Sequence, residues 1–247
     1  IVGRQVAAAS AIRLRQLSQW SDNGYGHSVI LNMIPANKIK GIVDYTVAEP
    51  FFDKRYHILI PCRDEWVDRT PGNRRYVDFY TDGSKLDSQV GLGVYSEDLG
   101  LEMALRMPDY CSVYQAEILA IAEVAKWLRC NVLTKVGINI FSDSQAAIKS
   151  LESVFLNSTS ALNCRKSLNE MAQQFDIHLI WVPGHRDIPG NCRADELARL
   201  GTTLRVPARL ESVGMPLATC KLFLREEADR EANDRWIQGR DCVHASF

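Results

Sequence analysis

The stretch Tyr76–Lys85, YVDFYTDGSK, allows two incompatible interpretations that decide what the chain does. It begins with residues typical of a β-strand and reaches Asp-Gly, a common hairpin-turn signal because both residues tolerate positive φ angles. On this interpretation Asp82 only marks a turn. An acidic residue at the carboxyl end of a buried strand is, however, also where open α/β sheets place catalytic groups. These ten residues alone do not decide between a turn residue and a metal ligand.

The segments after Tyr76 predict a mixed α/β sheet. Three strands with short turns come first, followed by a helix for which Ser112 is a candidate N-cap. A strand, two helices, a strand and a helix ended by Gly201 complete the pattern, with the helices over the faces of the sheet. In order, the segments are RYVDFYTD, VGLGVYSED, LEMALRM, SVYQAEILAIAEVAKWLRC, KVGINIFSD, SQAAIKSLES, SALNCRKSLNEMAQQF (opened by Ser160), DIHLIWVPG and NCRADELARLG.

Two flanks surround this core, so we predict a basic flank at 1–74, a domain at 75–203 and a partly helical extension at 204–247. The first flank opens with the helix-like AAASAIRLRQLSQW and ends in DRTPGNRR, whose Pro-Gly and Asn indicate a linker. The last one contains LATCKLFLREEADREANDRWIQG, which predicts a charged helix facing solvent. Because the chain lacks an initiator Met, we expect a fragment of a longer polypeptide.

Composition narrows the class of protein. The chain has 247 residues, is 46% hydrophobic and is therefore globular, without an apolar run of the roughly 18 residues that a membrane span needs. Seven scattered cysteines without a C-x-x-C pair fit reduced thiols in the cytoplasm or nucleus. Residues 76–203 contain 11 Lys/Arg and 16 Asp/Glu, net −5, whereas residues 1–75 contain 11 and 7, net +4. The middle segment therefore argues against a plain nucleic-acid-binding module, unless bound cations reverse the local field.

Four acids in separate segments are candidates for one site. Asp82 and Asp143 end predicted strands, and Glu117 is the sole charge on the apolar stripe of its helix. In the last helix Glu196 belongs to the solvent face, while Asp195 falls on the inward side. Each acid also has a structural explanation: Asp143 is a possible helix cap, and Glu117 suits the positive end of the helix dipole. Four converging carboxylates would repel unless divalent cations lay between them, which favours Mg²⁺, with Mn²⁺ as a substitute.

Four motifs in order, ending with a long loop-and-helix motif, then make the chain recognisable. They resemble the motifs of type 1 ribonuclease H domains, over about residues 75–203, and as an ordered set they are specific. The residues within these motifs are also similar to those of the domain near the end of polyproteins from jockey-like non-LTR retrotransposons. The segments on either side of the domain are similar to the segments that flank it there. The motifs are YTDGSK, YQAEILAI, IFSDSQAAI and WVPGHRDIPGNCRADELA.

The resemblance implies a five-stranded mixed sheet, three antiparallel strands then two parallel, and cleavage of the RNA strand of RNA–DNA hybrids to 3′-hydroxyl and 5′-phosphate ends. It implies two Mg²⁺ ions, about 4 Å apart in such sites. Asp82 would bridge both ions, Asp195 would hold the ion that activates water, and Glu117 and Asp143 would hold the other. An attached reverse transcriptase, ending in residues 1–74, is the implied partner, and we expect a monomer.

The resemblance also implies roles for residues around the acids. His185, in a Pro- and Gly-rich loop, would assist proton transfer or product release near the leaving group. The link from Ser153 to Ser160 is too short for the basic helical protrusion with which some cellular members grip hybrids. We therefore expect weak hybrid affinity for residues 76–203 alone, with residues 1–75 or an attached polymerase supplying the grip.

Five further residues are predicted to contact the substrate. Gln115 would reach the minor groove of the hybrid, where the 2′-hydroxyl distinguishes RNA from DNA. Ser84 and Ser144 would bind phosphate, and Asn191 would cap the last helix or approach the same phosphate. Gly83 completes the set.

Two other functions remain open at this point. Integrases and resolvases share the architecture but usually lack the closing segment with GH and the AD-x-LA pattern. A catalytically silent binding or scaffold domain would keep the fold without the chemistry. Degenerate copies normally lose their acids first, and all four are present.

Overall fold

The structure is a computed structural model that describes residues 43–47, 49–68, 75–133, 137–184 and 186–238. The predicted N-terminal helix, most of the linker DRTPGNRR and His185 lie outside these ranges. The chain divides into two compact units, one formed by Asp44–Gly214 and one by Ile1–Val43 with Met215–Phe247. The predicted boundaries at residues 75 and 203 stay a prediction.

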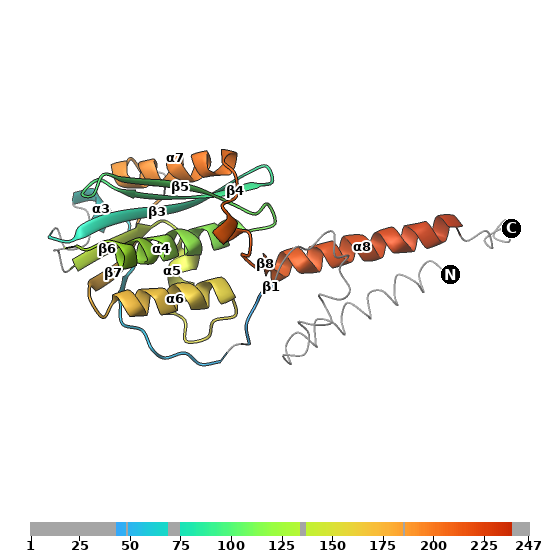
Figure 1. Ribbon diagram of the computed structural model, residues 1–247, viewed down its shortest axis with the longest axis horizontal. Helices are drawn as coiled ribbons and strands as arrows, with labels where there is room; N and C mark the ends of the chain where they lie inside the picture. Colours follow the sequence, from blue (N-terminus) through green and yellow to red (C-terminus); the bar gives the residue numbers. More distant parts are fainter. Residues whose placement is uncertain (1–42, 48, 69–74, 134–136, 185, 239–247) are drawn as a thin grey trace. The chain divides into compact units, whose positions relative to one another are not determined.

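The larger unit is built on a six-stranded mixed sheet in the order β2-β7-β6-β3-β4-β5 (Figure 1). The pairs β2–β7, β7–β6 and β6–β3 are parallel, and β3–β4 and β4–β5 are antiparallel. The predicted mixed α/β fold is therefore confirmed: β3, β4 and β5 are the predicted antiparallel strands, β6 and β7 are the predicted parallel ones, and β2 adds a sixth strand. In chain order the strands are β2 (His57–Leu59), β3 (Val77–Leu86), β4 (Gln89–Ser96), β5 (Leu101–Met107), β6 (Gly137–Ser142) and β7 (Asp176–Trp181).

The sixth strand, β2, corrects the prediction of five strands. It has only three residues, His57–Leu59, and its two end residues are exposed. A half-buried strand is recognised by alternation over four or more residues, and β2 is too short to show it. The residues of β2 therefore lie within the predicted flank 1–74, for which no strand is predicted.

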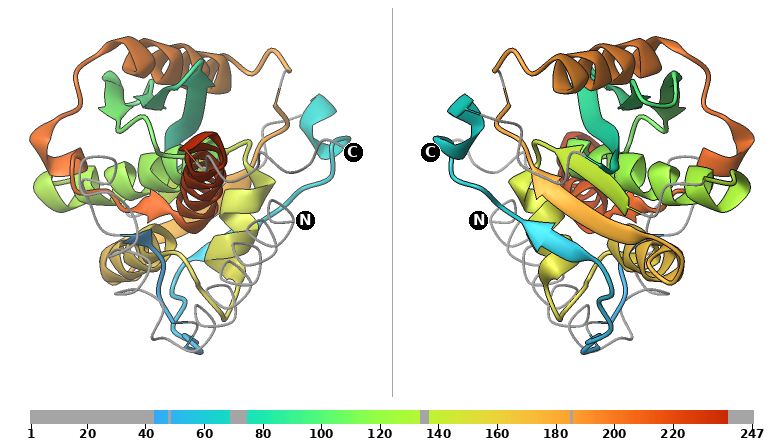
Figure 2. Two further views of the ribbon diagram at one scale, coloured as in Figure 1. Left: turned by 90° about the vertical axis from the view of Figure 1, so that its right-hand side faces the viewer. Right: turned by 90° about the vertical axis from the view of Figure 1, so that its left-hand side faces the viewer.

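Helices cover both faces of the sheet, as predicted (Figure 2). Helix α7 lies on one face, over β3, β4 and β5, whereas α4 packs on the other face with α6 beside it. Each of α4, α5 and α6 starts with a serine N-cap, at Ser112, Ser144 and Ser158 respectively, so the predicted start at Ser160 is two residues late. The helices are α3 (Glu65–Asp68), α4 (Val113–Cys130), α5 (Gln145–Glu152), α6 (Thr159–Met171), α7 (Pro189–Thr203) and the short 3-10 helix η1 (Ala208–Leu210).

Glycines let α7 approach the sheet closely. A Cβ on Gly93 would lie 2.2 Å from the Ala194 carbonyl oxygen, and one on Gly91 would lie 2.3 Å from that of Ala198. Gly201, predicted to end the helix, instead lies inside α7, where a Cβ would meet the Leu105 carbonyl oxygen at 2.6 Å. Because these glycines have no side chains, the backbone of α7 can lie close to the backbones of β4 and β5. The prediction that Gly201 ends the helix is wrong.

The smaller unit contains β8 (Met215–Pro216) and the predicted charged helix, which is confirmed as α8 (Leu217–Gln238). The two-residue strand β1 (Val43–Asp44) spans the boundary between the units. Among the helices that the structure describes, none has the length and apolar character required to cross a membrane.

Candidate active site

Asp82 lies inside β3 instead of ending it. Parallel pairing of β3 with β6 stops at Thr81 and Ser142, whereas antiparallel pairing with β4 continues to Leu86. The hairpin turn comes later, at Asp87, whose φ is 53°. The Asp-Gly pair is thus not the turn, and Asp82 is the first residue of β3 beyond the parallel part of the sheet.

Gly83 provides room for the start of α4. A Cβ at this position would lie 2.7 Å from the Glu117 backbone nitrogen and 2.8 Å from the Ala116 Cβ. Because Gly83 lacks one, the first turns of α4 rest directly against β3 beside Asp82. The predicted substrate contact of Gly83 stays a prediction, but its close approach to α4 explains why this position is glycine.

Three of the four predicted acids come together. One carboxylate oxygen each of Asp82, Glu117 and Asp143 lies within 4.8 Å of the others. Asp82 and Glu117 are 6% and 5% exposed, and Asp143 is half-buried. The Glu117 Oε2 atom is buried without a hydrogen-bond partner in the part of the chain that the structure describes. A buried carboxylate oxygen of this kind is costly unless a cation or a proton compensates it.

Burial and mutual repulsion disfavour charge on this group of acids. Burial is the main cause that raises the pKa of Asp82 to about 8, followed by the nearby carboxylates of Asp143 and Asp195. Burial, Asp82 and Asp143 likewise raise the pKa of Glu117 well above its usual range. Hard oxygen ligands at this spacing are what Mg²⁺ and Mn²⁺ take in proteins, so the residues fit divalent cations.

Asp195 lies near these three acids but outside their group. Its carboxylate forms an ion pair with Arg199, one turn further along α7, at 2.8 Å, and 37% of its side chain is exposed. It still contributes to the raised pKa of Asp82. Cys192, expected to share an inward side with Asp195, is exposed, while Ala198 is buried. Asp195 therefore lies at the border of the buried face of α7 rather than within it.

The predicted substrate residue Gln115 is only 1% exposed and all its side-chain polar atoms are in use. Its Nε2 donates to Asp44 Oδ2 at 3.0 Å and to the Gly214 carbonyl oxygen at 2.8 Å. Its Oε1 accepts from the Ser112 backbone amide at 3.1 Å, which completes a capping box at the start of α4. The Gln115 side chain therefore holds together the start of α4, Asp44 and Gly214, and its predicted contact with the substrate stays a prediction.

The other predicted substrate residues differ in burial and in their hydrogen bonds. Ser144 is the N-cap of α5 and accepts from the Ala147 amide at 3.3 Å, while Ser84 is half-buried on β3. Asn191 is 5% exposed and does not cap α7, whose N-cap is Ile188. The Asn191 Oδ1 atom is buried without a hydrogen-bond partner among the residues described.

Sequence reasoning missed two residues beside the acids. The Ser142 hydroxyl hydrogen-bonds Glu117 and opposes the rise in its pKa. A Cβ on Gly184 would lie 2.8 Å from Asp143 Oδ2, so the backbone there comes close to the acid. Gly184 belongs to the sequence WVPG, in which Pro-Gly indicates a loop but not a contact with an acid. Ser142 is buried, and no sequence pattern indicates its contact with Glu117.

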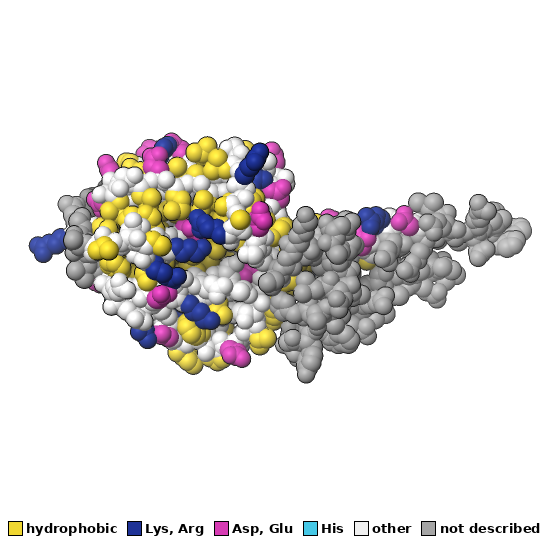
Figure 3. Space-filling model, in the orientation of Figure 1, with side chains coloured by type: hydrophobic (Ala, Val, Ile, Leu, Met, Phe, Trp, Pro, Cys, Tyr) yellow, Lys and Arg dark blue, Asp and Glu magenta, His cyan; other side chains and the backbone are white. Residues whose placement is uncertain are grey.

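The surface around the core shows mixed charge. On the face drawn in Figure 3, Lys and Arg side chains lie among Asp, Glu and hydrophobic side chains. This agrees with the net charge of −5 for residues 76–203, from 11 basic and 16 acidic side chains. Several of the basic side chains lie near one another over the middle of that face, with acidic side chains beside them.

Comparison with known families gives one result. The sequence model of a family described as RNase H matches residues 74–203, more than half of the 247-residue chain. The match covers every strand from β3 to β7 and all four acids. Together with the sheet order, it confirms the predicted RNase H-like fold and supports ribonuclease H activity in general.

Proposed function

Because the chain belongs to the RNase H family, we propose that it is an endonuclease that hydrolyses the RNA strand of RNA–DNA hybrids, leaving 3′-hydroxyl and 5′-phosphate ends. The observation that supports this most is the group of Asp82, Glu117 and Asp143, whose carboxylate oxygens lie within 4.8 Å of one another. These acids raise one another's pKa and so favour a divalent cation over three separate charges.

In this proposal Asp82, Glu117 and Asp143 hold divalent cations, Mg²⁺ or Mn²⁺, and Asp195 completes the set. When bound, a pair of such ions supplies charge neutralisation and alignment for in-line attack on the phosphodiester. The chain itself positions the ligands. Because Gly83 has no side chain, the start of α4, which carries Glu117, lies directly against β3. To take part, the Asp195 carboxylate must leave Arg199, its partner at 2.8 Å.

His185 is assigned, from the resemblance, to proton transfer at the leaving group. Ser84, Ser144 and Asn191 are proposed to contact the substrate. Among them, Asn191 has a buried amide oxygen without a partner in the described part of the chain, so it has capacity for a further hydrogen bond.

The polyprotein context belongs to the same proposal. The net charge of −5 over residues 76–203 provides little attraction for a polyanion. Helix α5 ends at Glu152 and α6 begins at Thr159, so the link between them has no room for a basic protrusion. An attached reverse transcriptase of a non-LTR retrotransposon, or the basic residues 1–75, would supply the grip on the hybrid.

The test uses labelled RNA–DNA hybrid, duplex DNA and duplex RNA, each with Mg²⁺ or with EDTA. The wild-type chain is expected to cleave only the hybrid and only with the metal, and Asp143→Asn is expected to abolish cleavage. Glu97→Gln, at an exposed position, is the matched control and should retain full activity. Cleavage of all three substrates would contradict the proposal, and hybrid binding without cleavage would favour a catalytically silent domain.

A further inference from the structure

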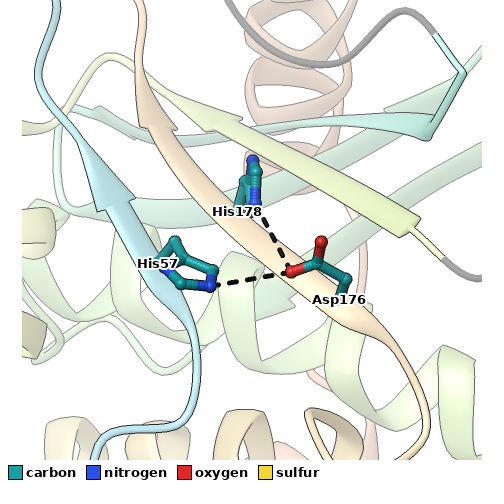
Figure 4. A group of neighbouring side chains, drawn as sticks. All are labelled: His57, Asp176 and His178. Atoms are coloured by element: carbon teal, nitrogen blue, oxygen red, sulfur yellow. Dashed lines mark ion pairs between the residues drawn. The ribbon is translucent and has the colours of Figure 1, made fainter.

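A second cluster of potential metal ligands lies away from the acidic group, at the edge of the sheet formed by β2 and β7. His57 on β2 lies opposite His178 on β7 in the parallel register of the two strands. Asp176 precedes His178 by two residues and therefore projects from the same face of β7. Figure 4 shows both imidazoles directed toward the same oxygen of the Asp176 carboxylate.

The distances within this cluster suit a small tetrahedral ion. The Asp176 Oδ1 atom is 3.4 Å from His178 Nε2 and 3.8 Å from His57 Nε2. One ligand atom from each residue lies within 4.8 Å of the other two. In a tetrahedral zinc site with bonds of about 2.0–2.2 Å, neighbouring ligand atoms are about 3.3–3.6 Å apart. The two distances to Asp176 are thus close to the tetrahedral values, and the separation of the two histidine ligand atoms is at most 4.8 Å.

Neighbouring groups already orient the cluster. The Tyr76 hydroxyl hydrogen-bonds Asp176 Oδ2, which leaves Oδ1 facing the two imidazoles. A hydrogen bond of this kind to a ligating carboxylate is the usual outer support of a metal site. The Tyr76 and His178 rings pack with their centroids 5.3 Å apart, and the His57 and His178 rings meet edge-on at 5.1 Å.

His178 presents its Nε2 atom to the cluster, 3.4 Å from Asp176 Oδ1, and 21% of its side chain is exposed. Its Nδ1 atom is buried without a hydrogen-bond partner among the described residues. Zinc binding through Nε2 would leave the ring proton on Nδ1, so the geometry at Nε2, and not the state of Nδ1, supports the site.

We propose that His57, Asp176 and His178 form a Zn²⁺ site whose fourth position is open to water or another ligand. Two imidazoles and one carboxylate suit zinc, whereas Mg²⁺ prefers sites made only of oxygen atoms. The site lies at the start of β7, whereas the acidic group lies beyond the carboxyl ends of β6 and of the parallel part of β3. From Asp176 to Trp181 a strand spans about 16 Å, so the two sites are separate.

The role that follows from the fold is structural. Strand β2 has three residues and, among the strands that the structure describes, pairs only with β7, so few of the described backbone hydrogen bonds hold it. A zinc ion that joins His57 to two β7 residues would fasten this edge strand to the sheet. It would thereby fix the segment that precedes the catalytic core in the sequence.

The test titrates Zn²⁺ into the full chain, previously treated with EDTA and dialysed, by calorimetry and by thermal unfolding. Co²⁺ serves as a spectroscopic probe, since tetrahedral Co²⁺ absorbs visible light far more strongly than octahedral Co²⁺. The wild type should bind one equivalent through this site, with a higher midpoint of unfolding and the tetrahedral Co²⁺ bands. His57→Asn is the principal variant, because 68% of the His57 side chain is exposed and the substitution should not disturb folding.

His57→Asn and His178→Asn are each expected to weaken this binding at least about tenfold and to remove the zinc-induced rise in the unfolding midpoint. His244→Asn is the matched histidine control, Cys62→Ser tests an exposed thiol, and Asp143→Asn tests the acidic group. These three should bind Zn²⁺ at the site as the wild type does. Absence of zinc binding in the wild type, or equal affinity in His57→Asn and the wild type, would overturn the proposal.

Discussion

Asp82 and Asp143 directly follow Thr81 and Ser142, the last two residues in register between the parallel strands β3 and β6. Parallel strands end at the same edge of a sheet, so the backbone brings these two carboxylates to the same level. Glu117 reaches them from the adjacent helix because Gly83 lets α4 rest against β3. The repulsion among the acids is therefore a consequence of the fold itself, and it can be measured.

The first prediction concerns Asp82 and pH in the absence of divalent cations. The pKa of Asp82 is raised from 3.8 to about 8 in the folded protein, so folding favours the protonated carboxyl. The stability that this provides is complete below about pH 4 and is lost as the pH rises through about 8. Asp82→Asn should therefore be more stable than the wild type at pH 8, by roughly 2–4 kcal/mol, and similar to it near pH 4.

Urea unfolding at both pH values in EDTA measures this difference, and added Mg²⁺ should reduce it by stabilising only the wild type. A variant less stable than the wild type at pH 8 in EDTA would contradict the repulsion inferred for the acidic group.

The second prediction concerns Asp195, which the structure pairs with Arg199. If Asp195 helps to hold a cation, Asp195→Asn should lower hybrid cleavage at least about tenfold and raise the Mg²⁺ concentration needed for half-maximal rate. Arg199→Gln should change stability by less than about 1 kcal/mol, because the pair is partly exposed, and should not raise the Mg²⁺ requirement. The neighbouring acid gives the control, Glu196→Gln. Equal activity in Asp195→Asn and Glu196→Gln would remove Asp195 from the site.

The third prediction concerns the contact between Gly93 and α7. Gly93→Ala places a Cβ 2.2 Å from a backbone oxygen of the helix, so either the helix or the strand must move. The free energy of unfolding should fall by about 1–3 kcal/mol or more, and cleavage should fall with it as Asp195 is displaced. Gly100→Ala is the comparison, because Gly100 has a φ of 58° and no atom within 4 Å of its added Cβ. It should lose about 1–2 kcal/mol of stability but no activity while folded.

The fourth prediction separates a structural role of Gln115 from a substrate contact. Gln115→Ala removes the donor to the buried Asp44 carboxylate and should lower the free energy of unfolding by about 1–3 kcal/mol. The exposed Gln89→Ala should change it by less than about 0.5 kcal/mol. Chemical denaturation measures both, and hybrid KM is measured in parallel. A raised KM with unchanged stability would instead assign Gln115 to the substrate.

The fifth prediction concerns His185, which lies outside the described residues. His185→Ala should lower the cleavage rate by roughly 10²-fold without abolishing it, since general acid–base catalysis contributes on this scale. Single-turnover cleavage of labelled hybrid compares it with Asp82→Asn, which should show no cleavage. Loss as complete as that of Asp82→Asn would count against the assignment to proton transfer.

The sequence predicts those elements that depend on patterns of neighbouring residues. Helical periodicity and the Ser112 cap located α4, and short segments typical of strands, separated by turns, located β3 to β5. Helix α5 is also predicted, with Asp143 as its possible cap, whereas the structure gives Ser144. Local patterns fail for features whose cause lies across the fold: they predict a helix end at Gly201, which instead lies within α7 in contact with β5. Asp195, predicted on the inward side, is a different case: its partner Arg199 lies one turn along the same helix, and this local ion pair accompanies its place at the border of the buried face.

By itself, the sequence determined the order of elements from β3 to α7 and predicted four acids as candidates for one site, because each of these depends on neighbours close along the chain. Only the tertiary structure decided that Asp82 continues a strand instead of opening a turn, since that depends on pairing with β4. Only the tertiary structure set His57 beside Asp176, residues more than a hundred positions apart that two adjacent strands bring together. Contacts between distant segments depend on the packing of whole elements, and no local pattern encodes them.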